Sequence, residues 1–102
     1  MIMLTIHFQA VNYKADVKLK EYASKRLNKL SLFHNRILEI LIFTKLENSS
    51  NRINKWAEIK IEIPGDDIIV KKISKSFEES INAAAESAER ILKRRREKER
   101  VI

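Results

Sequence analysis

Hydrophobic and polar residues alternate along two stretches of the chain, Met1–Phe8 and Trp56–Ile63. Successive side chains of a strand point to opposite faces, so this period of two predicts strands with one covered face and one face in water. A denser run of apolar and β-branched residues, Ile37–Glu47, predicts a central strand. The turn-forming sequence Pro-Gly-Asp at 64–66 predicts a hairpin into a fourth strand over about Asp67–Ile73.

Two other stretches repeat their apolar residues at helical spacing. Asp16 can cap a helix over about Val17–Leu30, and Ser76 with Glu79 forms a capping box that opens a second helix, Ser76–Arg100. The apolar arc of the first helix is Leu19, Tyr22, Ala23, Leu27 and Leu30, and that of the second is Phe77, Ile81, Ala84, Ala85, Ala88, Ile91 and Leu92. A basic end, about residues 93–102, continues beyond the second arc.

The order β-α-β-β-β-α predicts an α+β fold. A strand, a crossover helix and a second strand form a right-handed parallel unit, and the later hairpins run antiparallel, so the four-stranded sheet is mixed. Each helix has one apolar side and the sheet has one apolar face, which predicts a two-layer sandwich with two helices on one face. The other face of the sheet is left open to water. The length of 102 residues predicts a single domain over residues 1–102.

Composition adds a preference for a polyanionic partner. The chain carries 21 Lys and Arg against 14 Asp and Glu, a formal net charge of +7, which favours nucleic acid over an anionic membrane. Cysteine is absent, and neither a signal peptide nor a long apolar span is present, so we expect a cytoplasmic protein without membrane association.

Catalytic chemistry finds little support in the sequence. His7 and His34 have no acidic residue at a spacing that indicates a shared site, and metal-ligand clusters are missing. Glu58 and Glu62 lie on one strand face, but Lys60 between them makes cross-strand charge pairing the simpler explanation. We therefore expect no enzyme activity, no cofactor, no metal and no small-molecule substrate.

Basic residues form a stripe on each predicted helix. The stripes are Lys18, Lys25, Arg26 and Lys29 on the first helix, and Arg90, Lys93, Arg94, Arg95, Arg96 and Lys98 on the second. Cations along two neighbouring helices could contact the phosphates of structured RNA. The alternative is a solvated helix end, favoured by the helix dipole. Side-chain phase leaves open whether the two stripes face each other or point apart.

The order of elements, together with YASKRLNKL at 22–30, WAEIKIEIPG at 56–65 and ERILKR at 89–94, resembles the ribosome hibernation factors, hibernation-promoting factor and ribosome-associated inhibitor A. This resemblance implies a fold like a double-stranded-RNA-binding domain. It also implies binding to ribosomal RNA of the small ribosomal subunit, in the cleft where mRNA and tRNA would lie, through the helix cations. The cations of the family's two helices fall on Lys25, Arg26, Lys29, Arg90, Lys93, Arg94 and Arg96, and with Lys18 these are the eight candidate binding residues. Ser87 and Glu78 depart from the family, which has a lysine and an aromatic there. Because the chain ends at Ile102, it resembles the short form, and we expect a monomer.

The leading hypothesis is therefore a hibernation factor that blocks translation on idle ribosomes by steric exclusion, in stress or stationary phase. A general binder of structured or double-stranded RNA is the first alternative. A protein-interaction module is the second, because Leu41, Phe43, Trp56 and Ile69 could make the open sheet face apolar. Packing of that patch by Lys45 and Lys71 would equally explain it.

Overall fold

The structure is a computed structural model that describes residues 4–48 and 51–100. Its elements, in chain order, are β1 (Ile6–Val11), α1 (Val17–Asn28), the 3-10 turn η1 (Lys29–Leu32), β2 (Glu39–Leu46), β3 (Lys55–Ile63), β4 (Asp66–Ser74) and α2 (Phe77–Arg100). This is the predicted order. None of the helices in the described ranges is long and apolar enough to cross a membrane.

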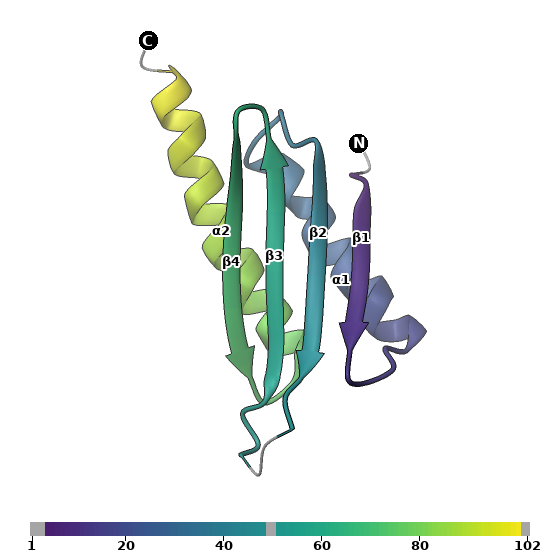
Figure 1. The fold of residues 1–102 in the computed structure, drawn as a ribbon. Coiled ribbons are helices and arrows are strands. Elements are labelled where there is room, and N and C mark those ends of the chain that lie inside the picture. The colour runs from purple at the N-terminus through teal and green to yellow at the C-terminus, as the bar shows by residue number, and fades with distance from the viewer. Residues whose placement is uncertain (1–3, 49–50, 101–102) are drawn as a thin grey trace.

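The four strands form one sheet in the order β1-β2-β3-β4. β1 pairs with β2 in parallel, and the two later pairs are antiparallel. Both helices lie against the same face of the sheet, and α2 extends past the ends of β3 and β4 (Figure 1). The predicted two-layer α+β fold with one open sheet face is confirmed.

The core lies between the helices and the covered sheet face. Its sheet side is formed by alternate residues of the strands, including Ile40, Ile42, Ala57, Ile59, Ile61, Ile63, Ile68 and Val70. Its helix side contains Leu19, Ala23 and Leu27 of α1, Leu30 of η1, and Ile81, Ala84, Ala85, Ala88 and Leu92 of α2. The predicted apolar arcs are confirmed, with Tyr22, Phe77 and Ile91 packed at the margin.

The boundaries of three elements differ from the prediction by two residues or more, and those of β3, β4 and α2 differ by one residue. β1 continues to Val11, and the residues expected to begin it, 1–3, lie outside the described part of the chain. α1 ends at Asn28 because the chain tightens into the 3-10 turn, which still buries Leu30 completely. β2 begins at Glu39, two residues later than expected.

The predicted helix caps are present, although one is incomplete. The Asp16 carboxylate accepts a hydrogen bond from Leu19 N at 2.8 Å. Ser76 Oγ accepts one from Glu79 N at 3.1 Å, but the Glu79 carboxylate accepts from Ser74 Oγ instead of returning to the Ser76 amide. The capping box of α2 therefore closes on one side only, and the strand before the helix supplies the second partner.

The alanines of α2 make a sharp test of this packing. Replacing fully buried Ala88 by Leu inserts three carbon atoms where α2 meets the sheet, and should lower the free energy of unfolding by about 1–3 kcal/mol. Ala83→Leu is the matched control, because Ala83 is only partly buried and should tolerate the change within about 0.5 kcal/mol. Urea unfolding measures both values. Equal effects of the two substitutions would contradict the close approach of α2.

Candidate nucleic-acid interface

Six of the eight predicted cations are exposed on the helix layer. They are Lys18, Lys25 and Lys29 from α1 and η1, and Arg90, Lys93 and Arg94 from α2. Among residues 4–48 and 51–100, none of these six side chains forms an ion pair. Arg90 Nη2 donates a hydrogen bond to Ser87 Oγ at 3.1 Å, on its own helix. The described part of the helix layer thus presents six exposed cations that form no ion pair.

Arg26 has a different position, between the two helices. Its Nε donates to Asn82 Oδ1 at 2.8 Å, and its Nη1 lies 2.5 Å from Glu89 Oε1. The Arg26 and Glu89 side chains are only 15% and 23% exposed. A charged pair sheltered in this way holds its geometry better than a solvated one. Arg26 therefore joins α1 to α2, and we name this line of contact the α1–α2 seam.

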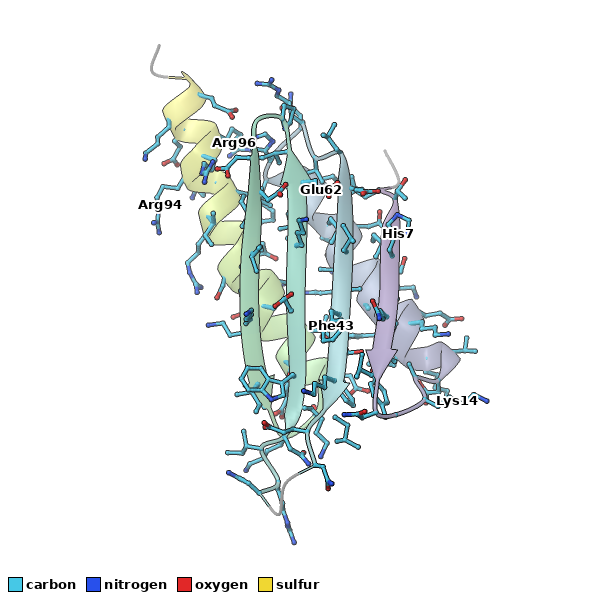
Figure 2. All side chains as sticks on the ribbon, viewed as in Figure 1. His7, Lys14, Phe43, Glu62, Arg94 and Arg96 are labelled. Atoms are coloured by element: carbon cyan, nitrogen blue, oxygen red, sulfur yellow. The ribbon has the colours of Figure 1, made fainter. Side chains whose placement is uncertain are left out.

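The seam shows how the two basic stripes are oriented. Lys29 and Lys93 each follow a seam residue, Arg26 and Glu89, by about one helical turn, so both lie on the seam side of their elements. Arg90 comes one residue after Glu89 and is therefore turned about 100° away around the α2 axis. Arg94 projects from α2 on the side away from the strands (Figure 2). The stripes converge at Lys29 and Lys93 and diverge at Arg90 and Arg94.

Arg96 lies against the loop after η1. Its Nη1 donates to the Leu32 carbonyl oxygen at 3.4 Å, and its buried Nε has no partner in the described part of the chain. His34 is 2% exposed beside it, accepts a hydrogen bond at Nδ1 from Arg36 N, and directs Nε2 toward Glu99 at 3.4 Å. Because Nδ1 is an acceptor, a neutral His34 carries its proton on Nε2. These residues border a surface pocket of about 340 Å³.

Arg95 connects the basic end of α2 to the sheet. Its guanidinium forms an ion pair with Asp66, at the start of β4. The hydrogen bond from Arg95, with a smaller contribution from the Asp67 amide, lowers the pKa of Asp66. The described end of α2 is therefore held from two directions, by Asp66 and by the η1 loop, which the solvated-end interpretation did not anticipate.

Sequence reasoning identified the cations but not the partners that position them. Asn82, Glu89, His34 and Asp66 make contacts with residues far away in the sequence, and no local spacing indicates them. The result is an exposed, positively charged surface suited to phosphate groups. Within the described ranges, no three His, Cys, Asp or Glu residues are grouped so as to hold a metal ion.

The Arg26–Glu89 pair predicts that Arg26 contributes to stability, whereas the exposed cations contribute little. Arg26→Ala should lower the free energy of unfolding by about 1–3 kcal/mol, because it leaves Glu89 and Asn82 sheltered without their partner. Lys25→Ala, at the exposed neighbouring position, should change it by less than about 0.5 kcal/mol. A double-mutant cycle with Glu89→Ala, read by urea unfolding, should give a coupling of about 1 kcal/mol. Zero coupling would contradict the pair.

The Arg95–Asp66 pair predicts a pH dependence. Because the folded-state pKa of Asp66 is lowered, the pair contributes stability at neutral pH, and that contribution is lost as pH falls through the lowered pKa. Asp66→Asn should therefore show a smaller drop in Tm between about pH 5 and pH 3 than the unchanged protein. Glu97→Gln, at an exposed position of α2, is the control. Parallel pH profiles of all three proteins would rule out the Asp66 contribution.

Comparisons with known proteins agree with this architecture. The family model described as Sigma 54 modulation protein / S30EA ribosomal protein matches residues 6–100. A ribosomal subunit interface protein from Coxiella burnetii superposes with a TM-score of 0.80 at 17% identity, covering 91% of this chain and 98% of that one. The N-terminal domain of Thermus thermophilus Protein Y gives a TM-score of 0.71 at 21% identity, covering 89% and 98%.

Among curated protein sequences, none matches the chain significantly. The two structural similarities have low sequence identity, so they support the fold alone. The match over residues 6–100 covers nearly the whole chain and confirms the resemblance to ribosome hibernation factors. The chain belongs to the Sigma 54 modulation protein / S30EA ribosomal protein family.

Proposed function

We propose that this protein is a ribosome hibernation factor. It binds the small ribosomal subunit in the decoding channel, which mRNA and tRNA occupy during translation, and blocks translation by steric exclusion. It acts on idle ribosomes, in stress or stationary phase. Family membership supports the association with ribosomes. The observation that supports the binding mode is the group of six exposed cations on the helix layer that form no ion pair with any residue the structure describes.

The proposed mechanism requires only that the protein binds and fills space, and no covalent bond is made or broken. Lys18, Lys25, Lys29, Arg90, Lys93 and Arg94 neutralise phosphates of ribosomal RNA and release their counterions. The Arg26–Glu89 pair fixes the spacing of these cations, since it joins the helices that carry them. A body of about 50 × 24 × 19 Å then occupies space that mRNA and tRNA need.

Arg26 and Arg96 belong to the same site in different ways. Arg26 lies within the α1–α2 seam, where its guanidinium already pairs with Glu89. A bound phosphate and Glu89 would therefore both contact the Arg26 side chain. Arg96 lies partly exposed at the edge beside the η1 loop, where Nη1 contacts the Leu32 carbonyl oxygen and the guanidinium has further donors for RNA. A general binder of structured RNA remains the alternative function, because phosphate contacts carry no sequence information. Comparable affinities for a plain RNA duplex and for small subunits would favour that alternative.

Charge reversal at the seam tests the proposed binding surface. Lys29→Glu combined with Lys93→Glu removes two exposed cations, and should weaken binding to purified small subunits at least tenfold at physiological salt. The slope of log K against log salt should fall by about 1.4–1.8, the value for two lost phosphate contacts. Binding measured by sedimentation over a salt series gives both quantities.

Arg52→Glu combined with Lys75→Glu is the matched control, because it changes the net charge equally on exposed residues outside the helices and the open sheet face. This control should keep the slope of the unchanged protein. If both double variants lose affinity and slope to the same extent, net charge governs binding and the helix surface is not the site.

A further inference from the structure

The open sheet face is the second large surface of the molecule, and it differs from the helix layer in character. Leu41, Phe43 and Trp56 are half-buried there, and Ile69 is 55% exposed. Two hollows of about 480 and 300 Å³ lie on this face, and both are lined by Phe43. Figure 2 shows Phe43 on β2. The face therefore offers apolar side chains and shallow depressions that could receive the side chains of a partner.

The charges on this face are mostly negative. Its carboxylates are Glu39, Glu47, Glu58, Glu62 and Asp67, and its lysines are Lys45, Lys60 and Lys71. Five carboxylates against three lysines make the face net negative on a protein whose formal charge is +7. Phosphates would be repelled here. The helix layer and the sheet layer thus suit partners of opposite charge.

Three of these carboxylates stand in one row across the sheet. Glu39 pairs in register with Glu62 on β3, and Glu62 pairs with Asp67 on β4. Lys60 reaches this row only at 3.8 Å from Glu62 and 3.7 Å from Asp67, and His7 lies 3.1 Å from Glu39. Like charges directly opposite one another on a sheet are unfavourable. The row keeps negative charge that the described residues only partly offset.

Titration reflects this crowding. The hydrogen bond between the Glu39 and Glu62 carboxyl groups lowers the pKa of Glu39, with a smaller contribution from His7, and raises the pKa of Glu62. Opposite shifts at the two ends of one contact mean that Glu39 and Glu62 titrate as a pair, in which ionisation of one carboxyl group disfavours ionisation of the other. A cation placed over the row by a partner would favour the ionised form of both.

We propose that the open sheet face docks a basic segment of a ribosomal protein, with its Lys or Arg side chains over the Glu39–Glu62–Asp67 row and its apolar side chains in the hollows beside Phe43. This inference rests on the proposed function, because the helix layer must hold the protein on the small subunit. Charge complementarity selects the occupant: an RNA segment is repelled by the face, and a basic peptide is attracted to it. The two layers then bind RNA and protein at the same time.

The test removes negative charge and looks for weaker binding. Glu62→Gln combined with Asp67→Asn makes the protein more basic, so its affinity for deproteinised small-subunit RNA should stay the same or rise. Affinity for intact small subunits should nevertheless fall by roughly fivefold, because the basic segment loses its partners. The Tm of the free double variant should stay close to that of the unchanged protein, because the relief of carboxylate repulsion offsets the loss of the two exposed Lys60 pairs, and this separates weaker binding from loss of folding.

Glu21→Gln combined with Glu97→Gln is the matched control, with the same change of charge at exposed helix positions. It should bind both the RNA and the intact subunits at least as tightly as the unchanged protein. If the sheet-face variant also binds intact subunits as tightly or more tightly, the inference is overturned and the proposed function stands. Failure of the unchanged protein to bind subunits would overturn both.

A second copy of the chain is the other occupant that this test can reveal. Its basic helix layer would also complement the open face of a neighbour. Sedimentation equilibrium of the protein alone should show a monomer. A dimer that the Glu62→Gln/Asp67→Asn variant loses would assign the face to self-association and overturn the ribosomal protein as partner.

Discussion

The close contact of α2 with the sheet sets the arrangement of the whole molecule. Ala84, Ala85 and Ala88 are fully buried, and such small side chains let the helix axis approach the strands. α1 must bury its own apolar side on the same sheet face, so the two helices lie next to each other. Every polar side of the helices then points outward or into the seam, which is why the cations of both helices form one surface.

The α1–α2 seam fixes the positions of the two helices that carry that surface. A guanidinium with two side-chain partners resists rotation more than an exposed lysine does, and Arg26 holds both Asn82 and Glu89 of α2. The basic end of α2 is similarly held by Asp66 on one side and by Leu32 and His34 on the other. The exposed cations are thus carried by helices that Arg26, Arg95 and Arg96 hold in place. This arrangement suits the recognition of an RNA shape, because little of the backbone has to become ordered on binding.

Charge is divided between the two layers of the sandwich. Within the described ranges, the helix layer has six exposed cations without ion pairs, whereas the sheet layer has a row of carboxylates and a half-buried apolar centre. Glu39, Glu62 and Asp67 stand next to one another in register, and like charges in such positions are unfavourable. Lys60 and His7 offset the row only in part, and the remaining negative charge is the physical reason to regard the open face as a binding surface.

The sequence by itself determined the elements, their order and the buried arcs, because period-two and helical repeats are local properties of the chain. It also identified the exposed lysines of the helix layer, whose role needs only exposure and charge. Only the tertiary structure decided that Arg26 lies in the seam, that Arg95 and Arg96 fasten α2, and that three carboxylates share a row. Those features depend on contacts between residues distant in sequence, and such contacts exist only once the helices have packed on the sheet and the strands have taken their register.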